Sequence, residues 1–188
     1  MKLFSIVPAL VLILCASVCR GQSVRWSADG QSYYTLENGD ILRYTLPAQS
    51  KTTYVPKQQL TPTNTREPLD VKDFNILEKN GLVILFTNTK KVWRYDTRGD
   101  YWLLDRNTGK LKQLGNGRPD ASLMFAKLSP DGKKAAYVSE YNLYLEDLAT
   151  GQVKALTTGG HRKLINGTFD WVYEEEFAFV KAFDWSKD

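Results

Sequence analysis

Cysteine is nearly absent from this sequence of 188 residues, which contains two cysteines and one histidine. Both cysteines, Cys15 and Cys19, lie in an apolar N-terminal segment, so the rest of the chain has no thiol for a disulfide. Zinc sites of the usual type are excluded there, because they need three or four cysteine and histidine ligands. We expect neither a metal nor another cofactor.

The sequence also lacks the residues that a serine nucleophile requires. No Gly-x-Ser-x-Gly segment occurs, and His161 follows two glycines in a predicted loop. Nucleophilic catalysis needs a nucleophile, a base and an orienting group held together. Phosphate-binding loops and dinucleotide fingerprints are absent as well. We therefore expect no catalytic residue in this chain, which should be inactive alone.

Neither sign of charge dominates the sequence. Its 25 basic and 21 acidic residues give a formal net charge of +4. A nucleic-acid partner requires basic residues gathered on one face or stripe, and the basic residues here are dispersed. We therefore expect no nucleic-acid partner.

Long apolar runs are also rare, and the one of note lies at the N-terminus, between Leu3 and Ala16. It follows a lysine and precedes small residues, as is typical of a secretory signal peptide, which we place at residues 1–21. The run is shorter than the roughly 20 apolar residues of a membrane span. We expect export to the periplasm, the medium or the cell surface. An uncleaved anchor, and lipidation at Cys15 or Cys19, are the alternatives.

The rest of the chain is rich in aromatic residues and carries a recurring turn. Aromatic residues make up 12% of the sequence and favour strands. The turn reads Trp-Ser-Ala-Asp-Gly at 26–30, Leu-Ser-Pro-Asp-Gly at 128–132 and Trp-Ser-Lys-Asp at 185–188. Proline and glycine favour chain reversal at such positions. With one unmarked unit between the first two turns, the period is about 50 residues.

Each unit is predicted to contain about four short strands. The predicted strands of the second unit are Val71–Leu77, Leu82–Thr87, Lys91–Tyr95, Tyr101–Asp105 and Lys110–Leu114, and those of the third are Leu123–Leu128, Ala135–Ser139, Asn142–Asp147 and Gln152–Leu156. Four-stranded units at this period are typical of β-propeller blades. We expect an all-β partial propeller at residues 22–188, with about three four-stranded blades plus the start of another. A β-sandwich is the competing fold.

An acidic segment between aromatic residues, Asp-Trp-Val-Tyr-Glu-Glu-Glu at 170–176, interrupts this pattern. Adjacent side chains of a strand point to opposite faces, whereas on a helix they are about 100° apart and two can reach one ammonium group. Asp170 suits an N-cap, so we predict a short helical turn near residues 171–177. A solvated acidic helix start is the alternative. The glycosylation sequon at 166–168 is interpreted as a turn.

This acidic segment closely resembles the signature of the dipeptidyl peptidase IV family of serine exopeptidases. The family's second and third glutamates hold the free α-amine of the peptide substrate, which implies this role for Glu175 and Glu176. Glu174 would be a neighbour without direct contact. The Trp-Arg pair at 93–94, at the end of a predicted strand, resembles a family pair whose arginine contacts the substrate carbonyl. The resemblance therefore adds Arg94 to the substrate-binding residues.

The resemblance implies the N-terminal propeller portion of an exported exopeptidase that releases Xaa-Pro and Xaa-Ala dipeptides. Its partners would be peptides with a free N-terminus and its own C-terminal α/β-hydrolase domain, which carries the serine, aspartate and histidine of the family. That domain is absent from these 188 residues. A homodimer of the full-length protein is left open. The alternative, from another functional class, is a secreted propeller that only binds or acts as a scaffold.

Overall fold

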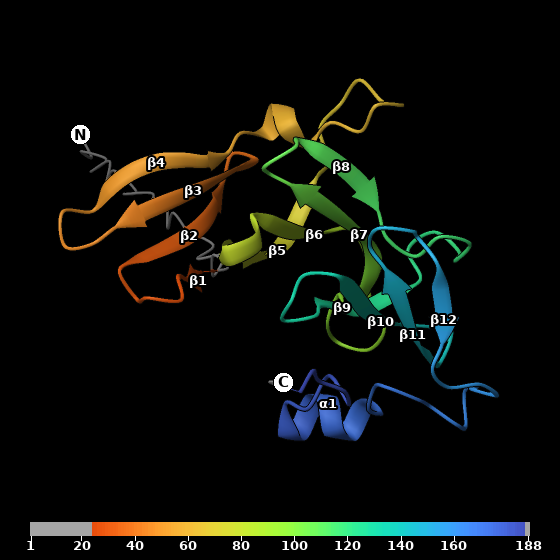
Figure 1. Cartoon of the computed structure of the whole chain (residues 1–188). Helices are drawn as coiled ribbons and strands as arrows, with labels where there is room; N and C mark the ends of the chain where they lie inside the picture. The colour runs from red at the N-terminus through yellow and green to blue at the C-terminus, as the bar shows by residue number, and fades with distance from the viewer. Residues whose placement is uncertain (1–23, 187–188) are drawn as a thin grey trace, which may run out of the picture.

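The structure is a computed structural model that describes residues 24–186, so the predicted signal peptide and both cysteines lie outside the described residues. The chain forms twelve strands, two 3-10 helices and one α-helix within this range (Figure 1). No helix among the described residues is long and apolar enough to cross a membrane.

The strands fall into three consecutive groups of four. The first group is β1 (Arg25–Trp26), β2 (Ser32–Glu37), β3 (Asp40–Thr45) and β4 (Ser50–Val55). The second is β5 (Val71–Leu77), β6 (Leu82–Lys90), β7 (Arg98–Asp105) and β8 (Lys110–Gln113). The third is β9 (Leu123–Leu128), β10 (Lys134–Ser139), β11 (Asn142–Asp147) and β12 (Val153–Ala155). The 3-10 helices are η1 (Lys57–Leu60) and η2 (Glu78–Asn80), and α1 (Trp171–Phe177) follows β12.

Within each group, consecutive strands pair antiparallel, as in a propeller blade. The second and third groups are joined because the start of β7 pairs with β9, over Arg98 with Met124 and Gly99 with Leu123. They thus form one eight-stranded sheet beside the four-stranded sheet β1–β4. The predicted all-β partial propeller with one short helix is confirmed.

The core lies between the blades. Alternate residues of β6 point to opposite faces, so Val83 and Leu85 join a cluster with the first blade, while Leu82 and Ile84 join a cluster with the third. The first cluster also contains Tyr34, Ile41, Val55, Leu60, Val71, Phe74 and Leu104, and the second Tyr101, Leu103, Leu114, Leu123, Ala135 and Tyr137. The middle blade is therefore buried on both faces, which fixes its loops relative to its neighbours.

The recurring turn is a repeated hydrogen-bond network. Ser129 Oγ donates to Asp131 Oδ1 (2.6 Å) and accepts from the Lys134 N–H (2.9 Å), and Asp131 Oδ1 also accepts from the Lys133 N–H (3.0 Å). Gly132 supplies the left-handed backbone, with φ of 72°. The same bonds and the same glycine conformation recur with Ser27, Asp29, Gly30, Gln31 and Ser32. The sequence repeat therefore reflects one local geometry used twice.

We expect Asp131→Ala to lower the urea midpoint of the chain at pH 7. The hydrogen bond from Ser129, and then that from the Lys133 N–H, lower the pKa of Asp131. A lowered folded-state pKa stabilises the fold above the unfolded pKa of about 4, and this stabilisation is lost as the pH falls. The difference in urea midpoint between Asp131→Ala and the unmodified chain should thus shrink below about pH 4. Asp120 is exposed, and Asp120→Ala is the control that should leave the midpoint unchanged. A deficit that stays constant from pH 7 to low pH would contradict this role.

One predicted strand is wrong. Residues 91–95 form a turn in which the Val92 N–H donates to the Tyr95 carbonyl (3.2 Å), and β7 begins at Arg98 rather than at the predicted Tyr101. The β6–β7 register shifts between Thr87 and Lys90, where Asn88 has a φ of 45°. Beyond this irregularity the pairing of β6 with β7 is limited to Lys90 with Arg98, and residues 91–97 leave the sheet as a loop.

Candidate functional site

The acidic segment folds as the predicted helical turn, α1. Asp170 Oδ1 accepts from the Val172 N–H (3.0 Å) and the Tyr173 N–H (3.3 Å), and so caps the helix. The helix ends at Ala178, whose φ of 57° is left-handed. Because the helix is short and held at both ends, the directions of its three glutamates are fixed.

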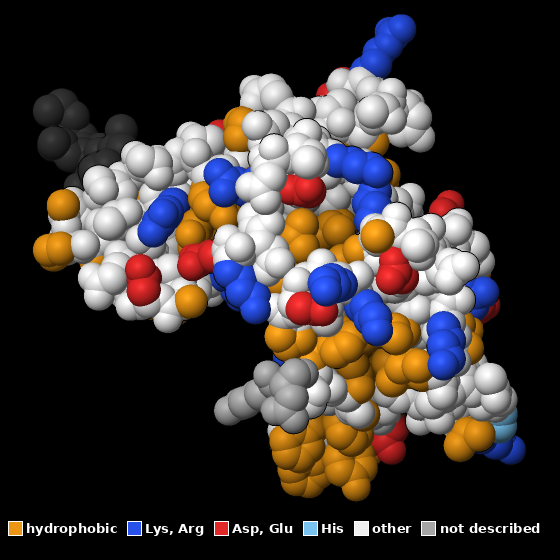
Figure 2. Space-filling view, in the orientation of Figure 1, with side chains coloured by type: hydrophobic (Ala, Val, Ile, Leu, Met, Phe, Trp, Pro, Cys, Tyr) orange, Lys and Arg blue, Asp and Glu red, His pale blue; other side chains and the backbone are white. Residues whose placement is uncertain are grey.

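The three glutamates of α1 have different environments. Glu174 is buried, with 3% of its surface exposed, whereas the Glu175 side chain is 13% exposed and Glu176 lies in solvent. The outward face of the helix segment is aromatic, and Figure 2 shows it as a large hydrophobic area at the lower edge of the molecule. Its exposed aromatic residues are Trp171, Tyr173, Phe177 and Phe179.

Arg94 and Glu175 form an ion pair, with Arg94 Nη2 2.6 Å from Glu175 Oε2. Arg94 lies in the turn after β6, not at a strand end as predicted, and this turn carries it to the helix. The Arg94 side chain is 64% exposed. A guanidinium has five N–H donors, so Arg94 can bind a further acceptor while it holds Glu175. Glu176, the next residue on the helix, is exposed.

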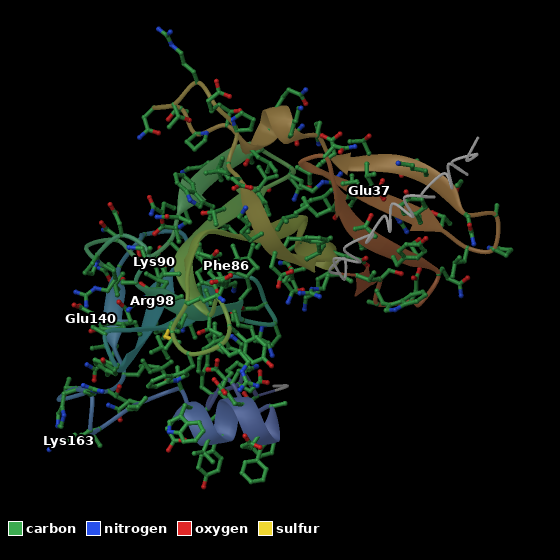
Figure 3. The ribbon with its side chains drawn as sticks, turned by 180° about the vertical axis from the view of Figure 1, so that it is seen from behind. Glu37, Phe86, Lys90, Arg98, Glu140 and Lys163 are labelled. Atoms are coloured by element: carbon green, nitrogen blue, oxygen red, sulfur yellow. The ribbon has the colours of Figure 1, made fainter. Side chains whose placement is uncertain are left out.

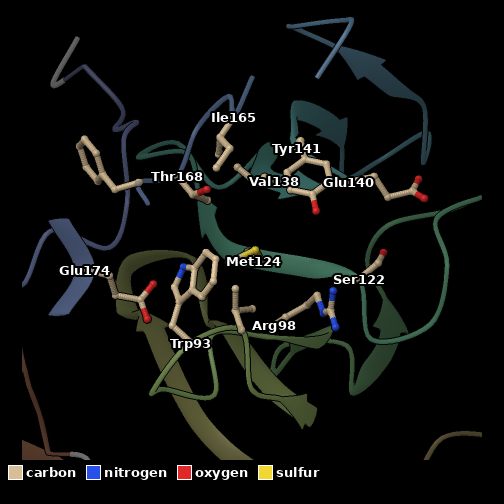
Figure 4. A pocket seen from close by; sticks show the side chains of 12 residues that line it. Trp93, Arg98, Ser122, Met124, Val138, Glu140, Tyr141, Ile165, Thr168 and Glu174 are labelled. Atoms are coloured by element: carbon tan, nitrogen blue, oxygen red, sulfur yellow. The ribbon is translucent and has the colours of Figure 1, made fainter. Parts of the chain in front are cut away.

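A hollow of about 330 Å³ adjoins the ion pair, between the 91–97 turn, the β10–β11 turn and α1 (Figure 4). It is lined by Val92, Trp93, Arg98, Ser122, Met124, Val138, Glu140, Tyr141, Ile165, Thr168, Phe169 and Glu174. Burial, and then the neighbouring charge of Glu175, raise the pKa of Glu174. Sequence reasoning missed this hollow, because three separate loops form it.

His161 and Asn166, which were singled out from the sequence, both lie in the segment between β12 and α1. His161 is exposed in the loop before α1, and its Nδ1 accepts from the Lys163 N–H (3.2 Å). Residues 24–186 contain no cluster of three or more histidine, cysteine or acidic side chains that could hold a metal ion. Asn166 of the sequon lies in a bend, where its side-chain amide donates to the Tyr141 carbonyl (3.1 Å). The solvent-facing charged groups of the site are thus the Arg94 guanidinium and the Glu175 and Glu176 carboxylates.

Comparisons with known proteins agree on one family. Residues 78–188 match the family model described as the dipeptidyl peptidase IV (DPP IV) N-terminal region. A probable dipeptidyl-aminopeptidase B of Arthroderma gypseum is 40% identical over 107 residues, which cover 56% of this chain. That of Emericella nidulans is 29% identical over an alignment that covers 90% of the chain.

The fold is also found in a solved structure. The crystal structure of Porphyromonas gingivalis dipeptidyl peptidase 4 matches 88% of this chain with a TM-score of 0.77 and 24% sequence identity. The chain spans only part of these proteins: 12% of the Arthroderma protein, 20% of the Emericella protein and 24% of the Porphyromonas chain.

Proposed function

Because the chain belongs to the dipeptidyl peptidase IV family, as its N-terminal region, we propose that it is the substrate-anchoring part of an exported exopeptidase that releases N-terminal dipeptides. The observation that carries this proposal is the ion pair of Arg94 and Glu175, with the exposed Glu176 as the next residue of the helix. It supports a site for a group that carries both a positive charge and a hydrogen-bond acceptor. The N-terminus of a peptide is such a group.

In this proposal Glu175 and Glu176 bind the free α-amine, and Arg94 donates to the first carbonyl of the peptide. Charge-assisted hydrogen bonds are short and directional, so a fixed carboxylate pair holds the amine at a set distance from the bond to be cleaved. Glu175 has a second oxygen for the amine while its Oε2 accepts from Arg94. Such a clamp would select peptides by their free end.

The remaining parts of the proposal concern the full-length protein. Cleavage would be performed by the serine, aspartate and histidine of an α/β-hydrolase domain in the same polypeptide, with an oxyanion hole. A pocket of that domain would select proline or alanine as the second residue. The signal peptide at residues 1–21 would direct export, and the full-length protein would be free to form a homodimer.

Product analysis of the full-length protein tests this function. We expect release of the N-terminal dipeptide from a peptide that begins Ala-Pro, and no release from the same peptide after N-acetylation, because acetylation removes the positive charge. The 188-residue chain alone should release nothing, since its sequence has a single histidine and no Gly-x-Ser-x-Gly segment. Cleavage of both peptides at the same rate, or cleavage at internal bonds only, would refute the proposed exopeptidase.

A further inference from the structure

The hollow beside the proposed amine clamp, which consists of Glu175, Glu176 and Arg94, contains two opposite charges that have no counter-charge of their own. Glu174 is buried, and its Oε1 accepts no hydrogen bond from any described residue. Arg98, which lines the same hollow, makes no side-chain hydrogen bond or ion pair within residues 24–186. Glu140 also lines it, but its carboxylate has a partner in Arg118 at 3.6 Å. The hollow therefore has one free negative and one free positive group.

These two groups lie on opposite sides of the hollow. Figure 4 shows Glu174 beside Trp93 on one side, and Arg98 beside Ser122 on the other. Arg98 is held at the start of β7, where it pairs with Lys90 of β6 (Figure 3). Glu174 is held by the first turn of α1, where its N–H donates to the Asp170 carbonyl (3.1 Å). Each charge is thus fixed by a different element.

The walls between the charges are largely apolar. Trp93, Tyr141 and Phe169 present aromatic rings, and the remaining apolar lining consists of Val92, Met124, Val138 and Ile165. A volume of about 330 Å³ lies near the lower end of the usual range for small-ligand sites, about 300 to 1,000 Å³. A buried carboxylate needs a proton or a donor, and a cation beside Glu174 would favour its ionised form.

We propose that this hollow is a second peptide site, separate from the amine clamp, which binds a dipeptide-sized zwitterion with its ammonium at Glu174 and its carboxylate at Arg98. The opposed charges select a ligand with two charged ends, and the apolar walls accommodate its side chains. Longer peptides are disfavoured by the volume. The inference goes beyond the proposed function, because it concerns binding and stands whether or not the full-length protein is a peptidase.

Binding of alanylalanine to the 188-residue chain tests this site, with the indole N–H signal of Trp93 as the reporter. The signal is identified by its loss in Trp93→Phe. We expect a saturable shift of this signal in the parent chain. Binding should be at least about tenfold weaker in Glu174→Gln and in Arg98→Gln, because each variant loses a charge-assisted hydrogen bond to the ligand. Glu67→Gln and Arg66→Gln, which change exposed charges elsewhere, should bind as the parent chain does.

Blocked ligands assign each end of the zwitterion. N-acetylation of the ligand should weaken its binding to the parent chain about tenfold but leave its binding to Glu174→Gln unchanged. C-terminal amidation of the ligand should likewise weaken its binding to the parent chain but leave its binding to Arg98→Gln unchanged. The proposal is overturned if the Trp93 signal does not move, if Arg66→Gln weakens binding as much as Arg98→Gln, or if Glu176→Gln weakens it as much as Glu174→Gln. The last result would place the ligand in the amine clamp. Since no turnover is measured, this outcome is independent of the test of the exopeptidase.

Discussion

In the full-length protein, Glu175→Ala and Glu176→Ala should each lower kcat/KM for a free-amine Ala-Pro substrate by about 10- to 150-fold. In the proposed clamp, each change removes one charge-assisted hydrogen bond to the substrate ammonium, worth roughly 1.5 to 3 kcal/mol. Glu175→Ala also frees Arg94 from its 2.6 Å ion pair, so this variant should lie at the upper end of the range. The measurement is steady-state hydrolysis of one chromogenic substrate by each variant.

Glu67→Ala, at an exposed position far from α1 in the sequence, is the matched control and should retain the activity of the unmodified protein. Circular dichroism and melting temperature should stay unchanged in both clamp variants, because neither carboxylate belongs to the core. The role proposed for the two glutamates fails if both variants keep kcat/KM within about twofold, which corresponds to less than about 0.5 kcal/mol.

Glu146→Ala should lower the unfolding free energy of the 188-residue chain by roughly 3 to 5 kcal/mol. Glu146 is 2% exposed, and its Oε2 accepts from the Gly115 N–H (2.8 Å) and the Tyr137 hydroxyl (3.2 Å). Lys112 Nζ lies 3.9 Å from Glu146 Oε1. Truncation leaves two buried donors without an acceptor and removes the counter-charge of Lys112. Urea unfolding, followed by fluorescence, measures the change.

Glu146→Gln is the informative comparison for this site. It keeps an acceptor oxygen for Gly115 and Tyr137 and removes only the charge, so its cost should be well below that of Glu146→Ala. Equal losses in the two variants would show that the charge, and not the hydrogen bonds, stabilises this part of the third blade. A loss of less than about 1 kcal/mol of unfolding free energy in Glu146→Ala would show that these hydrogen bonds contribute little to stability.

Local signals in the sequence predicted the blades and the helical turn, because short-range chemistry determines both. The turn at 128–132 needs only Ser129, Asp131 and Gly132, all within one segment, to form its hydrogen bonds. The N-cap of α1 is equally local, since Asp170 bonds the next N–H groups of the helix. Features of this kind can therefore be inferred from the sequence.

The arrangement of the site depends on tertiary contacts and could be predicted only in part. Arg94 was expected at a strand end, but after the irregularity at Asn88 only Lys90 still pairs with β7, and the chain then turns toward α1. The resemblance to the family suggested Arg94 and Glu175 as partners in one site without indicating that they pair directly. The burial of Glu174 and the position of Arg98 depend on how three loops meet, and no periodicity encodes that.

The effect of substrate acetylation on matched variants tests the amine clamp most directly. We would measure kcat/KM of the full-length protein and of its Glu175→Gln, Glu176→Gln double variant on an Ala-Pro substrate and on the N-acetylated form. If the two carboxylates bind the ammonium, acetylation should cost the unmodified protein at least tenfold and cost the double variant far less, since the interaction is already lost. Equal costs of acetylation in the two proteins would show that these glutamates do not recognise the amine.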